Sequence, residues 1–227
     1  MTEHEDFIIQ EPYQPNENEK QAIAKLEAKG LVAKDWDSQR RYIKSFKKNL
    51  REFTYNKQNQ LCAYCRIHVP KACVPMHREH IVYKDKHPQW MFLPNNLSVA
   101  CPYCNDFKGT TEVLKNPKTK TYPKTSKGFK IIHPFFDRYS DHIELLGGII
   151  YHGKTPKGVF TIQTCHLYRI ELAEERIYQK LFLENPGDII VELSHLLTLS
   201  SQYEKEINEL IEYVKTTVKD YKKKRQL

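Results

Sequence analysis

One stretch of the chain decides the fold: it begins with Cys62-Ala-Tyr-Cys65, contains Glu79-His80 and Asn96-Leu97, and ends with Cys101-Pro-Tyr-Cys104-Asn105. It combines two kinds of metal-binding side chain. Thiolates suit soft or borderline metals such as zinc, whereas carboxylate and amide oxygens suit hard divalent cations. A single short segment therefore contains ligands for two different sites.

The four cysteines have the spacing of a structural metal site. A Cys-x-x-Cys turn brings two sulfurs to one metal, and zinc prefers four such ligands in a tetrahedron. We expect a closed zinc site, whose binding energy contributes to folding, with the ligands Cys62, Cys65, Cys101 and Cys104. An iron centre and a redox dithiol are the alternatives. Cys73 and Cys165 have no partner at ligand spacing and are expected to be buried thiols.

The order of the motifs resembles the HNH branch of the His-Me finger (ββα-metal) nucleases. In that family an acidic residue and a His lie on a strand, Asn-Leu precedes a Cys-x-x-Cys pair, and an Asn or His and a Lys follow. The resemblance covers residues 60–112. It implies an α+β protein with a ββα-metal core, which a four-cysteine zinc site stabilises and which N- and C-terminal helices flank.

The resemblance also implies roles for individual residues. His80 would be the general base that takes a proton from water. Glu79 and Asn105 would hold one Mg²⁺ or Mn²⁺, which stabilises the leaving oxygen of the phosphodiester. Asn96 would hold the loop that positions the His. Two basic residues would contact the phosphate, Lys108 and Arg78.

Strand geometry constrains this site. Neighbouring residues of a regular strand point to opposite faces, so Glu79 and His80 reach one site only where the strand ends or twists. His77 shares a face with Glu79 and is either a third ligand or a partner that orients one. Gly109 stands where some HNH proteins have a further His.

The net charge and hydropathy of the chain indicate which partners and which cellular location to expect. The 227-residue chain has a formal net charge of +8, and a basic protein attracts polyanions such as nucleic acid. A lysine-rich solvated surface is the alternative. The mean hydropathy is −0.67, no apolar run approaches the roughly 18 residues of a membrane span, and the acidic N-terminus lacks the pattern of a secretory signal. We therefore expect a cytoplasmic protein without membrane association.

Four regions are expected: an acidic arm and N-terminal helices (1–59), the metal-binding core (60–112), a basic loop with short strands (113–165), and C-terminal helices with a basic tail (166–227). Residues 1–19 should be extended or disordered. Helical periodicity predicts helices over 16–29 and 39–57, one beginning at 166, and a last helix over 188–221 with room for a break near 200–201. Strands are expected within 74–82, 131–136, 143–150 and 158–163.

The segment around Asp137 and His142 allows two interpretations, part of a substrate groove or a turn with polar caps. For the whole chain we expect a metal-dependent endonuclease that hydrolyses DNA. An RNase and a non-catalytic, zinc-stabilised nucleic-acid-binding module are the alternatives. A weaker resemblance, in size and motif layout, links the chain to the HNH subunits that accompany an ATPase in Septu-type and retron-linked anti-phage systems. It implies a partner ATPase and an antiviral role.

Overall fold

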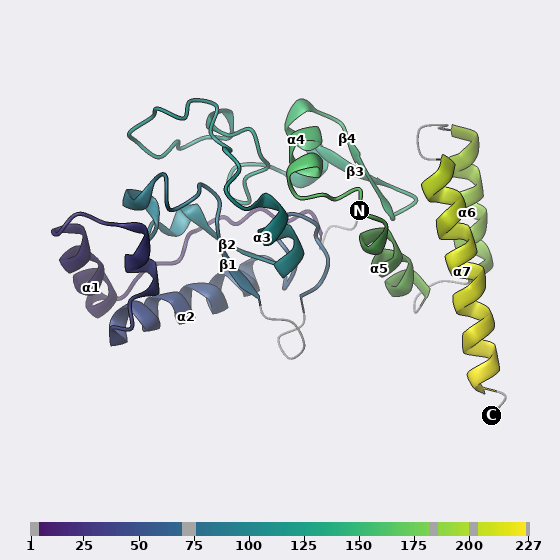
Figure 1. The fold of residues 1–227 in the computed structure, drawn as a ribbon, viewed down its shortest axis with the longest axis horizontal. Coiled ribbons are helices and arrows are strands. Elements are labelled where there is room, and N and C mark those ends of the chain that lie inside the picture. Colours follow the sequence, from purple (N-terminus) through teal and green to yellow (C-terminus); the bar gives the residue numbers. More distant parts are fainter. Residues whose placement is uncertain (1–4, 70–75, 182–185, 200–203, 226–227) are drawn as a thin grey trace. The chain divides into compact units, whose positions relative to one another are not determined.

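The chain forms two compact units of mixed helix and small sheets, an α+β architecture (Figure 1). The computed structural model describes residues 5–69, 76–181, 186–199 and 204–225. One unit, called the core unit, comprises residues 1–143 and 153–166; the other, called the helical unit, comprises residues 144–152 and 167–227. Cys73 lies outside the described residues.

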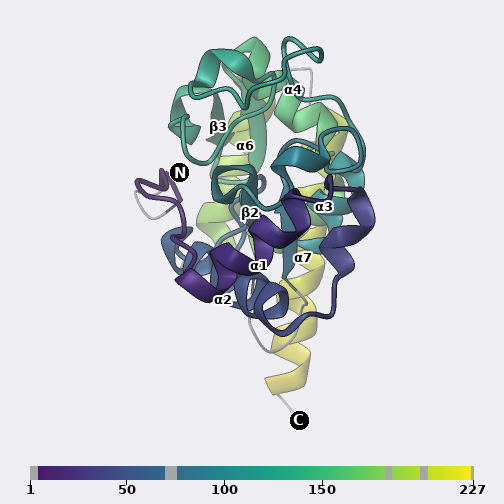
Figure 2. The same ribbon diagram turned by 90° about the vertical axis from the view of Figure 1, so that its left-hand side faces the viewer.

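Two N-terminal helices lie side by side in the core unit, α1 (Glu17–Glu27) and α2 (Arg41–Lys57) (Figure 1 and Figure 2). A capping box formed by Asn16 and Glu19 begins α1, because it satisfies backbone donors that a helix start leaves unpaired. The apolar stripe of α2 is fully buried and packs on Leu97 and its neighbours; it consists of Ile43, Phe46 and Leu50. Both helices expected from periodicity are confirmed.

The N-terminal segment is extended and packed, so the disordered alternative is wrong for its described residues. Phe7 and Ile9 are buried. The Ile9 amide donates to the Pro134 carbonyl at 2.9 Å, and the Asp6 carboxylate accepts from the Ser140 backbone and side chain. These contacts make the segment part of the core unit.

Strand β1 (His77–His80) pairs antiparallel with β2 (Leu97–Ala100), and helix α3 (Pro102–Lys108) follows and packs on β1. Two 3-10 turns, η2 (Pro88–Trp90) and η3 (Pro94–Asn96), lie in the connection. β1 is shorter than the predicted strand, because beyond His80 the Val82 amide bonds to the Asn96 side chain instead of to β2. The predicted residues 74–75 lie outside the described part.

Two of the predicted strands in residues 113–165 are wrong. Residues 131–136 form no strand, and residues 158–163 belong to helix α4 (Pro156–Thr164). Thr155 caps α4 by accepting from the Gly158 amide at 3.1 Å, and a proline in the first turn suits a helix start. Gly158 is needed for packing, since a Cβ there would collide with the His142 carbonyl. This region also contains two short 3-10 turns, η4 (Ser126–Gly128) and η5 (Tyr139–Asp141). Another such turn, η1 (Ala33–Asp37), lies between α1 and α2.

The helical unit combines most of a β-hairpin with three helices. The hairpin consists of β3 (Ile143–Leu146) and β4 (Ile150–Gly153), so the predicted strand over 143–150 is interrupted by a turn in which Gly147 and Gly148 have positive φ. The helices are α5 (Ile170–Leu181), α6 (Pro186–Leu199) and α7 (Glu204–Arg225), which share one apolar core. The predicted break at 200–201 falls outside the described residues. No helix in the described ranges is long and apolar enough to cross a bilayer.

Candidate metal centre and adjacent polar site

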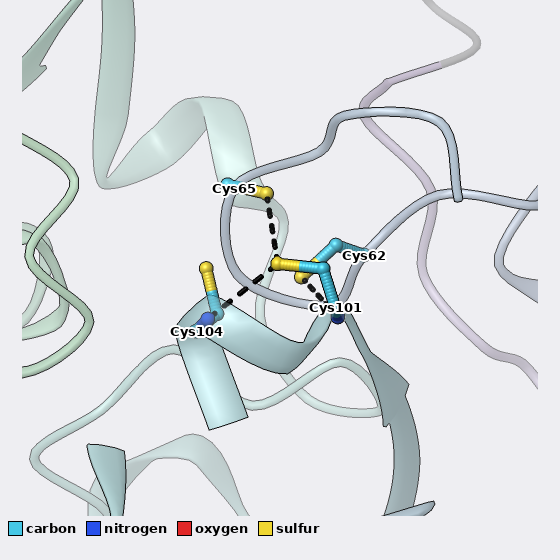
Figure 3. Close-up of side chains that lie close together, drawn as sticks. All are labelled: Cys62, Cys65, Cys101 and Cys104. Carbon is cyan, nitrogen blue, oxygen red and sulfur yellow. Dashed lines mark hydrogen bonds between the residues drawn. The ribbon is translucent and has the colours of Figure 1, made fainter. Parts of the chain in front are cut away.

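The four motif cysteines converge on one point (Figure 3). Their sulfurs all lie within 4.8 Å of one another, and the Cys65 and Cys101 sulfurs are 3.9 Å apart. A tetrahedral zinc with bonds of about 2.3 Å requires sulfurs separated by about 3.8 Å. The site therefore has the dimensions of a zinc cage and could hold a structural metal such as zinc. Among the described residues no other group of three His, Cys, Asp or Glu side chains has this arrangement.

Backbone amides surround the sulfurs. Cys101 N–H donates to the Cys62 sulfur at 3.3 Å, and Cys104 N–H donates to the Cys101 sulfur at 3.5 Å. Burial opposes ionisation of Cys62, but the hydrogen bonds from the neighbouring cysteines prevail and lower its pKa well below the ordinary value. The pKa values of Cys65 and Cys104 are raised by their thiol neighbours. Four adjacent thiols cannot all ionise without a cation between them, which is the role a metal would fill.

Cys165 lies outside the four-cysteine group. It is fully buried, and burial raises its pKa well above the ordinary value. The prediction of an ordinary buried thiol is confirmed for this residue.

Glu79 points into the interior of the core unit, toward α3. Its Oε1 lies 2.5 Å from the Lys108 ammonium and accepts a hydrogen bond from the Tyr64 hydroxyl at 2.9 Å. The Glu79 and Lys108 side chains are 5% and 1% exposed. Burial raises the pKa of Glu79, against the lowering effect of Lys108 and Tyr64. Lys108 therefore balances a buried carboxylate, and the phosphate contact predicted for it would require this side chain to leave the interior.

His80 points to the other face of β1. Its ring meets Trp36 edge-on at a centroid distance of 4.4 Å, and its Nε2 lies 3.2 Å from the Met91 carbonyl oxygen. A carbonyl can only accept, so this hydrogen bond requires the proton on Nε2 and leaves the lone pair on Nδ1. Burial lowers the pKa of His80 to about 3, so the imidazole is neutral at physiological pH.

Asn96 fastens the segment that follows His80. It is fully buried; its Oδ1 accepts from the Val82 amide at 2.8 Å, and its Nδ2 donates to the carbonyls of Val82 and Trp90, each at 3.1 Å. These three bonds tie the end of β1 to the turn before β2. The side chain thus fixes where the strand stops.

Asn105 lies on α3 and faces His77 on β1. The Asn105 amide nitrogen is 3.1 Å from His77 Nδ1, on the same face of the strand as Glu79. Gly109 ends α3 with φ +45° and donates its N–H to the Asn105 carbonyl. The structure therefore brings together His77, Asn105, Glu79 and Lys108 on one side of β1 and places His80 on the other.

Asp137 belongs to a capped turn. It is buried, accepts from the Lys157 ammonium at 3.0 Å and from the His133 amide at 2.7 Å, and lies 3.4 Å from His142 Nε2. The interpretation as a turn with polar caps between strands holds in part: Asp137 lies in a capped turn, but the strand expected before it, over 131–136, is not formed.

Three residues beside the predicted site carry no motif of their own. Tyr64, which contacts Glu79, gives no signal beyond its place inside a Cys-x-x-Cys pair. Lys47 and Arg51 lie one turn apart on α2; the charge on Arg51 lowers the pKa of Arg78, and the charge on Arg78 lowers the pKa of Lys47. Their helical spacing is visible in the sequence, but their approach to β1 is not.

Fold and site together define an α+β protein with a four-cysteine centre that could hold a structural metal such as zinc. The chain is similar to the Septu protein PtuB of Bacillus thuringiensis, with 30% identity over 113 residues. The match covers 50% of this chain and 38% of that relative, so the chain spans well under half of the relative's length. No protein-family model and no solved structure matches the chain.

Proposed function

We propose that the protein is a metal-dependent endonuclease of the HNH kind that hydrolyses DNA and acts in anti-phage defence with a partner ATPase. The observation that carries the proposal is the local architecture: a strand with Glu79-His80, an antiparallel partner, and a helix with Asn105, joined at a four-cysteine centre. The similarity to a Septu protein supports the defence role and the partner ATPase.

In this proposal His80 is the base. Its Nε2–H is held by the Met91 carbonyl, and Nδ1 takes the proton from the attacking water. Burial keeps the imidazole neutral but makes it a weak proton acceptor. A substrate phosphate nearby would raise the pKa of His80, because a negative charge favours the protonated form. Binding of the substrate would thus strengthen the base.

Glu79 and Asn105 supply oxygen ligands of the type that Mg²⁺ or Mn²⁺ prefers. Such a cation, when bound, acts as a Lewis acid toward the leaving oxygen. Lys108 already contacts Glu79 Oε1, so we assign the ligand role to the second carboxylate oxygen. His77, which contacts Asn105, orients the amide.

The test is cleavage of supercoiled plasmid with Mg²⁺ or Mn²⁺ by wild type and two histidine variants. His87 is a matched control, because it is as buried as His80, at 8% exposure each, and its ring also contacts a tryptophan, Trp90, at 4.4 Å. We expect His80→Ala to lower the cleavage rate by about 10²- to 10⁴-fold and His87→Ala to retain activity. Equal rates for His80→Ala and wild type would refute the assignment.

A second candidate, favoured by the pairing of Glu79 with Lys108, is a zinc-stabilised nucleic-acid-binding module without catalysis. A carboxylate already balanced by an ammonium has less need of a divalent cation. This candidate predicts salt-dependent DNA binding without metal-stimulated cleavage. The same assay with an RNA substrate distinguishes an RNase from both.

A further inference from the structure

Basic side chains from two elements lie on the His80 side of β1, close enough to influence one another's pKa. Residues alternate along β1, so Arg78 shares the face of His80 and lies opposite Glu79. Lys47 on α2 donates to the Trp36 carbonyl at 2.8 Å, and the Trp36 ring contacts His80. Arg51 follows Lys47 by one turn and projects from the same side of α2. The group of Lys47, Arg51 and Arg78 is called the basic cluster below.

No member of the basic cluster forms a salt bridge within the described ranges, although Asp37 lies near enough to raise the pKa of Lys47. The Nε atoms of Arg51 and Arg78 are buried and lack a hydrogen-bond partner among the described residues. All three side chains are half-buried. The arrangement is therefore a partly desolvated concentration of positive charge with donors left to satisfy.

Neighbouring charges indicate that these groups repel one another. Burial, and after it the charge on Arg51, lowers the pKa of Arg78. Burial, and after it the charge on Arg78, lowers the pKa of Lys47, although Asp37 opposes this in part. Like charges held together without a counter-charge raise the free energy of the unbound protein, and an anion would lower it.

Arg66 provides a contrast within the same unit. Its guanidinium is also buried without hydrogen-bond partners among the described residues, but it lies 3.5 Å from the centre of the Phe7 ring and 4.6 Å from that of Tyr139. Cation–π contacts therefore compensate this charge internally. Neither arginine of the basic cluster has such an aromatic partner in the part of the chain that the structure describes, so neither charge is compensated in this way.

We propose that Lys47, Arg51 and Arg78 form a phosphate-binding site for the backbone of a nucleic acid that lies along α2 next to His80. Guanidinium groups bind phosphate through two parallel hydrogen bonds, which suits paired arginines. Lys47 and Arg51 lie one turn apart along α2 and Arg78 lies on β1, and donors spread over two elements suit a linear polyanion rather than one small anion. This inference rests on the proposed function for its substrate class but not on cleavage.

The experiment measures fluorescence anisotropy of a fluorescein-labelled DNA duplex without Mg²⁺ or Mn²⁺, over a series of salt concentrations. We expect Arg51→Gln and Arg78→Gln each to reduce the slope of log affinity against log salt by about 0.9, equivalent to about an eightfold loss near 0.1 M salt. Lys48→Gln is the matched control, because Lys48 is exposed on the same helix; we expect less than a twofold loss. Equal losses in Lys48→Gln and Arg51→Gln, or no binding by wild type at low salt, would overturn the proposal.

Arg51→Lys and Arg78→Lys keep the charge and should keep the slope of log affinity against log salt. Arg51→Gln should not lower the thermal midpoint of the protein, because it relieves repulsion between like charges. A slope lost equally with Lys and Gln would refute a role for the charge. Failure of catalysis is a separate result. If the protein never cleaves DNA but both Gln variants reduce the slope of log affinity against log salt, the phosphate-binding site exists and the nuclease activity does not. Cleavage that depends on His80 with unchanged slopes retains the nuclease and refutes the site.

Discussion

Replacing Lys108 by Met should destabilise the core unit through Glu79. The ammonium of Lys108 is 2.5 Å from Glu79 Oε1 and also donates to the His80 carbonyl at 2.9 Å. Met has similar volume but no charge, so the change isolates the electrostatic loss from the loss of packing. Afterwards only the Tyr64 hydroxyl, among the described residues, faces the buried carboxylate.

The magnitude follows from the geometry. At 2.5 Å and an effective dielectric of about 20, the attraction is about 7 kcal/mol before the cost of desolvation. Removing one partner of such a buried pair costs about 3–5 kcal/mol, because the other charge stays buried. The loss of stability should grow as the pH rises above the pKa of Glu79 in the wild-type protein, which burial already raises above the ordinary 4.5. The variant raises this pKa further, and below it the protonated carboxyl tolerates burial in both proteins.

Urea unfolding followed by tryptophan fluorescence measures this loss, because both tryptophans, Trp36 and Trp90, belong to the core unit. Lys48→Met, at an exposed position, should change the free energy of unfolding by less than about 0.5 kcal/mol. The double variant Glu79→Gln/Lys108→Met should recover at least about 2 kcal/mol of the loss. A Lys108→Met protein within about 1 kcal/mol of wild type, or a double variant as unstable as Lys108→Met, would refute the reasoning.

Three further perturbations test the core unit. Chelation of zinc or Cys101→Ser should unfold it, because metal binding energy is folding energy; an unchanged thermal midpoint would contradict this. Burial lowers the pKa of both His80 and His133 to about 3. Their contribution to the free energy of unfolding should therefore be fully present above about pH 6.5 and fall toward pH 3, by up to about 1.4 kcal/mol per pH unit for each histidine. Urea unfolding that does not vary from pH 7 to 4 would exclude this pH dependence. Asn96→Ala should lower the free energy of unfolding by about 2–4 kcal/mol, since three buried backbone groups lose their hydrogen-bond partner. A loss below about 1 kcal/mol in urea unfolding would show that these three hydrogen bonds are dispensable.

Features encoded locally could be predicted from the sequence. The cysteine spacing determines which sulfurs can share a metal, and α1 and α2 follow from apolar periodicity with a capping box at Asn16. Helix α4 was missed because Val159, Phe160 and Ile162 suggest a strand, whereas Thr155 and the proline after it decide the outcome by capping. Here the signal is present in the sequence but is weaker than the apolar pattern.

Features that depend on tertiary approach could not be predicted. Nothing in the sequence near Lys108 indicates that its ammonium enters the interior to meet Glu79, because this contact requires α3 to pack on β1. The same holds for Arg51 and Arg78, which approach only because α2 packs against the sheet. Local patterns therefore identified the four cysteines of the candidate metal centre, whereas charge pairing was decided by packing.

The alternation of β1 divides the predicted nuclease site into two halves. Glu79 faces α3 and its lysine, whereas His80 shares its face with Arg78 and the tryptophan that Lys47 contacts. A cation held by Glu79 and a base at His80 can act on one phosphate only at the end of the strand, which the Asn96 bonds fix just beyond His80. Lys108 spans that end, because its ammonium reaches both the Glu79 carboxylate and the His80 carbonyl. A catalytic protein would need this ammonium to share the carboxylate with a metal, while a binding module would need it to stay, so the Glu79–Lys108 pair separates the two candidate functions.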